Sequence, residues 1–136
     1  MYPEAIVNPM KAELTAVGFS ELLNPEEVDK AIGHQGTVLM VVNSVCGCAA
    51  GACRPGVTKS LEHSKKPSKL TTVFAGFDME AVAQARKHFS PYPPSSPAIA
   101  LFKNGELVHF IERHNIEGHS ASAISEHLKA VYDEFC

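Results

Sequence analysis

The chain has 136 residues, of which 45% are hydrophobic, and its 12 basic and 15 acidic side chains give a net charge of -3. This length and composition predict one globular domain, residues 1–136, with a single hydrophobic core. The basic residues are scattered along the chain, so no nucleic-acid partner is expected. No apolar run approaches the roughly 20 residues of a membrane helix, so no membrane partner is expected either.

The start of the chain, Met1 to Glu4, lacks the basic and then apolar order of a secretory signal, which predicts a cytoplasmic protein. Thiols are kept reduced in that compartment, so a structural disulfide framework is disfavoured. The four cysteines are therefore candidates for reactive or metal-binding roles: Cys46, Cys48, Cys53 and Cys136.

Two short helices are predicted in an N-terminal extension over residues 1–35. Asn8-Pro9 has the residue order of an N-cap followed by proline at the first helical position, and Gly18 is the predicted stop. Asn24-Pro25 repeats this start signal, and Gly33 ends the second helix.

Residues 36–136 show alternating strand and helix patterns. The continuous apolar run 38–42 predicts a strand that is covered on both faces. A helix is expected from Cys46 to about Lys65, with interruptions at Gly51, Pro55 and Gly56. The next predicted elements are a strand from Leu70 to Ala75 and a helix capped by Asp78.

A hairpin and a helix complete the pattern. Asn104-Gly105 separates the apolar runs 98–103 and 106–111, and this dipeptide is a strong signal for a tight hairpin turn. The final helix is expected from about Ser120, with one apolar stripe. The order is that of an α/β thioredoxin-like fold, a mixed sheet of about four strands flanked by helices, with the first two helices added at its N-terminus.

The dithiol motif Cys46-Gly47-Cys48 lies where the first long strand gives way to a helix. Free backbone N–H groups and the helix dipole favour a thiolate at a helix start, and the thiolate is the nucleophilic form. The motif therefore predicts thiol–disulfide exchange, with Cys46 as the nucleophile and Cys48 as the resolving thiol.

A one-residue spacer raises a geometric difficulty. In a regular helix, Cys46 and Cys48 would project to opposite sides, about 200° apart. A bridge between them would have to deform the turn, and Gly47 is the residue type that best permits this deformation.

Cys53 leaves two interpretations open. A small buried cysteine that packs the helix onto the sheet is favoured, because free cysteine is among the most buried residue types. The alternative is a soft-metal module in which Cys46, Cys48 and Cys53 act as thiolate ligands. For the chain as a whole, an interaction domain that uses the thiols only as a redox sensor, without turnover, is a further alternative. No paired Cys and His spacing of a zinc site is present, so no bound metal is expected.

Several stretches spread over nearly the whole chain resemble the bacilliredoxin family: Val42–Gly51, Arg54-Pro55, Thr72–Gly76, Pro94–Pro97, Val108–Ile111, Arg113-His114 and Ile116–His119. The resemblance implies a thioredoxin-like enzyme without a bound cofactor that uses the small thiol bacillithiol as co-substrate and removes it from S-bacillithiolated client proteins. General thiol–disulfide exchange or disulfide isomerase activity is the alternative. Cys53 departs from the family pattern, where alanine is expected, and could be a third redox thiol.

The resemblance and the fold order also imply site residues around the dithiol. Pro97 occupies the place of the cis-proline that faces the thiol motif in thioredoxin-like proteins, and Ser96 precedes it. Asn43, Gly47, Ser96 and Pro97 are the expected substrate-binding residues. A disulfide reductase is the expected partner for recycling.

Overall fold

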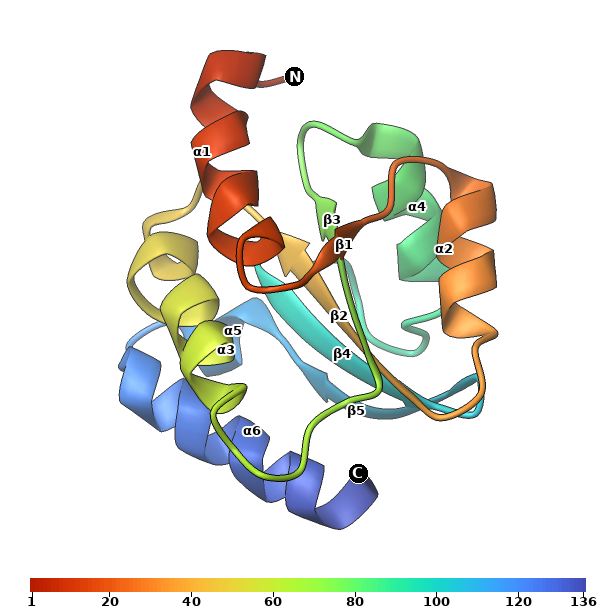
Figure 1. The fold of residues 1–136 in the computed structure, drawn as a ribbon. Coiled ribbons are helices and arrows are strands. Elements are labelled where there is room, and N and C mark those ends of the chain that lie inside the picture. The colour runs from red at the N-terminus through yellow and green to blue at the C-terminus, as the bar shows by residue number, and fades with distance from the viewer.

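The computed structural model describes all of residues 1–136 and shows one five-stranded sheet flanked by helices (Figure 1). None of the helices is both long enough and apolar enough to cross a membrane. The strands are β1 Ser20–Glu21, β2 Thr37–Asn43, β3 Lys69–Phe74, β4 Ala98–Lys103 and β5 Glu106–Ile111. The helices are α1 Glu4–Thr15, α2 Pro25–Ile32, the π-helical segment η1 Ala49–Cys53, α3 Arg54–Ser60, α4 Met79–Lys87, α5 Arg113–Ile116 and α6 Ala121–Phe135.

The sheet is mixed, with the strand order β1-β3-β2-β4-β5. Strand β2 lies at its centre, parallel to β3 and antiparallel to β4, and all seven of its residues are buried, as its apolar run predicts. The predicted fold class is confirmed. The sheet has five strands rather than about four, because the two-residue strand β1 pairs with β3 and joins the N-terminal segment to the sheet.

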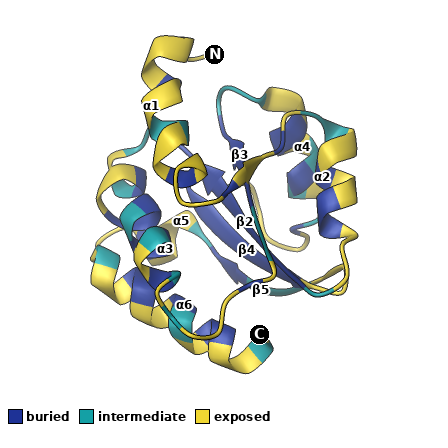
Figure 2. Ribbon diagram, in the orientation of Figure 1, coloured by how far each residue is buried: buried dark blue, intermediate teal, exposed yellow.

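The core lies on both faces of the sheet. Helices α1, α3 and α6 cover one face, and α2 and α4 cover the other (Figure 1). Neighbouring residues of β2 contribute to opposite faces, with Met40 in the cluster under α2 and α4 and Leu39 in the cluster under α3 and α6. Figure 2 shows the resulting pattern of buried strands between helices whose outer faces are exposed.

The two predicted N-terminal helices have different outcomes. The start of α2 is confirmed, because the side chain of Asn24 accepts a hydrogen bond from the Glu27 N–H group at 2.9 Å. The predicted start of α1 at Asn8-Pro9 is wrong, since the helix begins at Glu4 and contains Pro9. The earlier start gives Val7 a fully buried position one heptad before Leu14 on the same helix face. Tertiary packing therefore outweighs the local cap signal.

The helix that follows β2 is shorter than predicted and irregular where the sequence predicts an interruption. It ends as α3 at Ser60 rather than near Lys65. The π-helical segment η1 ends two residues before Pro55, which has no N–H group to continue the regular pattern of hydrogen bonds. Asp78 precedes α4 as expected but does not cap it, because its carboxylate forms an ion pair with Lys11 at 2.9 Å.

The C-terminal elements follow their local signals. Asn104 and Gly105 both have positive φ, 52° and 85°, as the predicted hairpin turn requires. Helix α6 begins after Ser120, whose side chain accepts a hydrogen bond from the Ala123 N–H group. The one-turn helix α5 was not predicted, because four residues between β5 and α6 show no helical periodicity.

Gly56 of α3 packs tightly against α6. A Cβ atom at Gly56 would lie 2.7 Å from Cβ of Ile124 and 3.0 Å from the carbonyl oxygen of Ala121, neither of which can turn away. We expect Gly56→Ala to lower the free energy of unfolding by about 1–3 kcal/mol, the usual effect of overpacking. Urea unfolding measures this change. Gly51→Ala is the matched control, because a Cβ there meets no atom within 4 Å, and an equal loss in both variants would contradict the explanation.

Candidate active site

Cys46 occupies the N-cap position of the helix that leads into η1. Its carbonyl oxygen accepts hydrogen bonds from the N–H groups of Ala49 and Ala50, at 2.9 and 3.2 Å. Its Sγ atom accepts a hydrogen bond from the Cys48 N–H group at 3.4 Å. A partly exposed sulfur at this position faces free N–H groups and the positive end of the helix dipole, which favour its thiolate form.

The two sulfur atoms of the dithiol motif are in contact. The Sγ atoms of Cys46 and Cys48 are 2.7 Å apart, and both cysteines are free thiols. The opposite projection that a regular helix would impose does not occur here, because Cys46 precedes the helix and its side chain turns toward that of Cys48. Gly47 is exposed between them, and a Cβ there would meet no atom within 4 Å. The surface beside the thiols is therefore open.

The contact between the thiols makes them unequal acids. The hydrogen bond from Cys48 is the largest contribution to a lowered pKa of Cys46; the Cys48 N–H group and the charge of Arg113 add to it, and burial opposes it. Burial, followed by the hydrogen bond to Cys46, raises the pKa of Cys48. One sulfur is thus disposed to be a thiolate, and the other is disposed to remain a thiol and donate to it.

A buried arginine fixes the loop between β2 and the dithiol. The Arg54 side chain is 2% exposed. Its Nη1 donates to Oδ1 of Asn43 at 3.0 Å and to the carbonyl oxygen of Ser44 at 2.8 Å, and its Nε donates to Glu13 at 2.9 Å. The Ser44 hydroxyl in turn accepts a hydrogen bond from the Cys46 N–H group at 2.9 Å. The position of Cys46 therefore depends on Arg54 through Ser44.

The structure changes the role expected for Asn43. This residue is 1% exposed, so a substrate cannot reach it. Its Nδ2 donates to the carbonyl oxygen of Met10 at 3.2 Å, and its Oδ1 accepts hydrogen bonds from Ser44 and Arg54. Asn43 is a positioning residue inside the loop, and the predicted substrate contact is corrected accordingly.

Ser96 and Pro97 lie at the same end of the sheet as the dithiol. They directly precede β4, and the pairing of Val42 with Ala98 places them beside the segment that leads from β2 to Cys46. The Ser96–Pro97 peptide bond is cis. Ser96 is partly exposed, whereas Pro97 is buried.

Arg113 is a site residue that the sequence analysis missed. It lies on α5, its side chain is 46% exposed, and its positive charge lowers the pKa of Cys46. Its guanidinium forms an ion pair with Glu117 and donates to the carbonyl oxygen of Ser96 at 3.4 Å. The sequence analysis includes Arg113 in the family resemblance but gives it no role, because only the fold places it near the thiols.

The remaining cysteines lie apart from this arrangement. Cys53 is 0% exposed, and burial raises its pKa to about 12, so its thiol stays protonated at neutral pH. This burial supports the packing interpretation of Cys53. No three His, Cys, Asp or Glu side chains are grouped closely enough to hold a metal ion together. Cys136 is exposed at the C-terminus.

The lowered pKa of Cys46 predicts a pH-dependent reactivity. Only the thiolate reacts with iodoacetamide, so the alkylation rate of Cys46 should rise with pH to a midpoint below that of an ordinary cysteine. We expect Cys48→Ala to move this midpoint to higher pH, because the largest stabilising hydrogen bond is lost. Arg113→Gln should move it less, and Arg86→Gln on α4 is the control. An unchanged midpoint in Cys48→Ala would contradict the assignment.

The fold is shared with solved thioredoxins. The chain resembles mitochondrial thioredoxin 3 of Saccharomyces cerevisiae with a TM-score of 0.62 and 16% identity, over 90% of this chain and 98% of that one. It resembles a thioredoxin of Halobacterium salinarum with a TM-score of 0.58 and 17% identity, over 85% and 88% of the two chains. A family model described as disulphide isomerase matches residues 2–136. The protein is a thiol–disulfide oxidoreductase with a thioredoxin fold.

Curated relatives identify the family. A bacilliredoxin of Cytophaga hutchinsonii is 65% identical, over 98% of this chain and 99% of that protein. A bacilliredoxin of Halalkalibacterium halodurans is 52% identical, over 99% and 94% of the two chains. The chain belongs to the bacilliredoxin family, which confirms the resemblance found in the sequence.

Proposed function

We propose that this protein removes bacillithiol from S-bacillithiolated proteins, with Cys46 as the nucleophile and Cys48 as the resolving thiol. The main support is the geometry of Cys46, whose partly exposed sulfur accepts hydrogen bonds from the thiol and the N–H group of Cys48. The names of the relatives support the small thiol as co-substrate. The nucleophile Cys46 and the residue that stabilises its thiolate, Cys48, are thus only two positions apart in the chain.

The first step is an exchange of disulfide bonds. The Cys46 thiolate attacks the bacillithiol sulfur of the mixed disulfide, and the bond between that sulfur and the client cysteine breaks. The client leaves as a thiolate and takes up a proton from solvent. Cys46 then carries bacillithiol as a new mixed disulfide, and no net oxidation or reduction has occurred.

The second step frees Cys46 from the adduct. Cys48 loses its proton to solvent and attacks the Cys46 sulfur, which releases bacillithiol as a thiolate and forms a Cys46–Cys48 disulfide. The 2.7 Å separation of the two sulfur atoms supports this step. Alternatively, a second bacillithiol attacks the bacillithiol sulfur of the adduct, and bacillithiol disulfide leaves. A disulfide reductase supplies the two electrons that restore the dithiol or the small thiol.

The exposed surface around the dithiol is the proposed binding site for the mixed disulfide. Gly47 leaves the approach to the sulfur atoms open, while Ser96 and Pro97 border it just before the start of β4. Arg113 adds a positive charge near the thiols, which favours a negatively charged substrate group over a neutral one.

Disulfide isomerase activity is the second candidate, favoured by the description of the matching family model. It uses the same nucleophile but acts on disulfides between two protein cysteines. Refolding of a scrambled disulfide protein tests it directly. Faster release of bacillithiol from a bacillithiolated client than reshuffling of the scrambled protein supports the first function, and the reverse order supports the second.

Intact-mass analysis after incubation with bacillithiol disulfide tests the proposal. We expect one bacillithiol adduct, mapped by peptide analysis to Cys46, in the Cys48→Ala variant. Glutathione disulfide at the same concentration is the matched control, and it should react more slowly. The exposed Cys136 is replaced by alanine throughout, so that its adducts do not interfere. An unmodified Cys46, or equal rates with both disulfides, would contradict the proposed co-substrate.

A further inference from the structure

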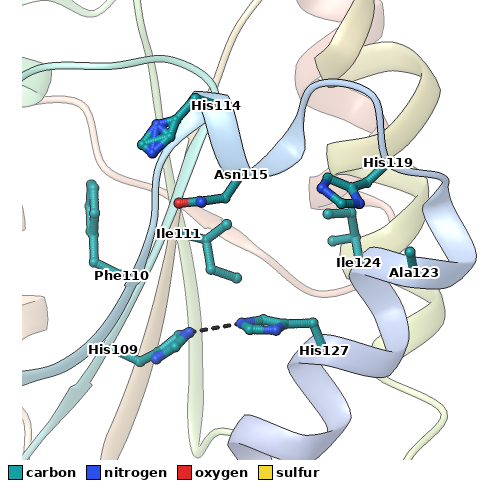
Figure 3. A pocket seen from close by; sticks show the side chains of 9 residues that line it. All are labelled: His109, Phe110, Ile111, His114, Asn115, His119, Ala123, Ile124 and His127. Carbon is teal, nitrogen blue, oxygen red and sulfur yellow. Dashed lines mark hydrogen bonds between the residues drawn. The ribbon is translucent and has the colours of Figure 1, made fainter.

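Helix α5 is a single turn whose residues contribute to two different parts of the surface. His114 and Asn115 line a pocket of about 460 Å³ between β5 and the N-terminal half of α6, together with three further histidines (Figure 3). Arg113 does not line this pocket. Its main-chain N–H group donates to the Ser95 hydroxyl at 3.3 Å, and its Nη1 donates to the carbonyl oxygen of Ser96 at 3.4 Å. Arg113 therefore lies beside the segment that precedes β4, at the dithiol end of the sheet.

The Arg113 guanidinium has donors that no protein group uses. Its Nε pairs with Glu117, and its Nη1 makes only the long contact with the carbonyl oxygen of Ser96. Its Nη2 has no hydrogen-bond partner in the protein, and the side chain is 46% exposed. The planar fork of a guanidinium matches the two oxygens of a carboxylate. A carboxylate from solvent can therefore bind to Nη1 and Nη2 while Glu117 keeps its bond to Nε.

The other arginine beside this loop, Arg54, cannot receive a substrate group. It is 2% exposed, and it donates to Glu13 and to the loop before the dithiol. Arg113, in contrast, is open to solvent and acts on the thiols. The hydrogen bond to Glu117, followed by the charge of Cys46, raises the pKa of Arg113, and the charge of Arg113 acts in turn on Cys46 and Cys48. Arg113 is thus the arginine that a substrate bound at the thiols can contact.

We propose that Arg113 determines substrate specificity by binding a carboxylate on the disulfide that Cys46 attacks, and that Glu117 is a positioning residue that holds the guanidinium by Nε and partly balances its charge. This inference rests on the proposed role of Cys46 as the attacking thiolate. In the exchange step, the Cys46 sulfur bonds to one sulfur of the disulfide, and the other half leaves as a thiolate. The carboxylate on Arg113 takes part in no bond change and only holds the disulfide beside Cys46. Because Glu117 is itself an anion, its charge limits the preference of the site for anionic disulfides.

Two small disulfides of similar size test the inference: dithiodiglycolate, which carries two carboxylates, and neutral hydroxyethyl disulfide. The rate constant for reaction with Cys46 is measured for each by stopped flow, in the full chain with Cys136→Ala. The ratio of the two rate constants is the charge preference, and any change in thiolate reactivity cancels from it. We expect Arg113→Gln to lower this ratio about fivefold, the upper end for one exposed charge pair. Arg113→Lys keeps the charge but not the planar fork, so it should restore only part of the ratio. Glu117→Gln keeps an oxygen for Nε but loses the charge, so it should raise the ratio about twofold.

A second ion pair, between Lys129 and Glu126 on α6, supplies the matched controls. Lys129→Gln and Glu126→Gln change the net charge by the same amounts and should leave the ratio unchanged. An equal ratio in the parent and in Arg113→Gln would overturn the inference, and so would an equal fall in Lys129→Gln. A parent ratio in Arg113→Lys would overturn binding through the guanidinium fork. If Cys46 of the parent reacted with neither disulfide, its proposed role as nucleophile would fail as well, so the two failures are distinguishable.

Discussion

Replacing Cys46 by alanine is expected to abolish thiol–disulfide exchange, with a fall in rate of at least about 10³-fold. The other thiols are poor substitutes, because burial raises the pKa of Cys48, Cys53 is buried and protonated, and Cys136 has a raised pKa and lies at the C-terminus. The measurement is release of bacillithiol from a bacillithiolated client protein. Cys136→Ala, at the exposed C-terminal thiol, is the control and should keep the parent rate.

Cys48→Ala should behave differently from Cys46→Ala, because it removes the second step and not the first. Cys46 remains as the nucleophile, but it loses the hydrogen bond that contributes most to its lowered pKa, so its attack slows. The adduct that does form accumulates, because no Cys48 thiol is present to resolve it. Non-reducing electrophoresis and mass analysis should detect a mixed disulfide on Cys46 in this variant only. Equal residual activity in the two variants, with no trapped adduct in either, would refute the assignment of roles.

Arg54→Met is expected to lower the free energy of unfolding by about 2–4 kcal/mol, because it leaves the buried carbonyl oxygen of Ser44 without its donor and removes a donor to Asn43. The loop that holds Cys46 should loosen as well. We therefore expect the alkylation midpoint of Cys46 to rise. Urea unfolding measures the loss of stability, and the pH profile of alkylation measures the midpoint of Cys46. If Arg54 acted on stability alone, this midpoint would not change.

Arg86→Met provides the matched control for Arg54→Met. Arg86 lies on α4, and its Nε atom is buried without a hydrogen-bond partner. The same substitution there should cost little stability and leave the alkylation profile of Cys46 unchanged. A loss at Arg86 as large as that at Arg54 would show that the hydrogen bonds of Arg54 to the loop are not the cause.

The elements with strong local signals were predictable from the sequence. Strand β2 is a continuous apolar run, the hairpin turn contains Asn104 and Gly105, and helix α2 begins at a cap whose hydrogen bond is present. Each of these signals is set by neighbours a few residues away. Helix α1 shows the limit of this reasoning, because burial of Val7 extends it beyond the cap signal at Asn8.

Part of the candidate site was predictable from the sequence, and part was not. The dithiol motif and its place after a buried strand are visible in the residue order, and so is the resemblance to the bacilliredoxin family. The contact between the two sulfur atoms was not predictable, because it depends on whether Cys46 lies inside the helix or at its cap. The role of Asn43 was also misjudged, since its burial is set by Met10 and Arg54, which are distant in the chain.

The sequence by itself determined the α/β order, the dithiol motif and the family, because these depend on residue types and on spacings of a few positions. Only the tertiary structure decided which groups surround Cys46 and which histidines meet. The charge of Arg113 on α5 acts on the thiols, and His109 is hydrogen-bonded to His127 across 18 positions of chain. The physical reason is that electrostatic and hydrogen-bonding effects act over a few ångströms in space, whereas the residues that exert them are brought together only when the sheet and its helices pack.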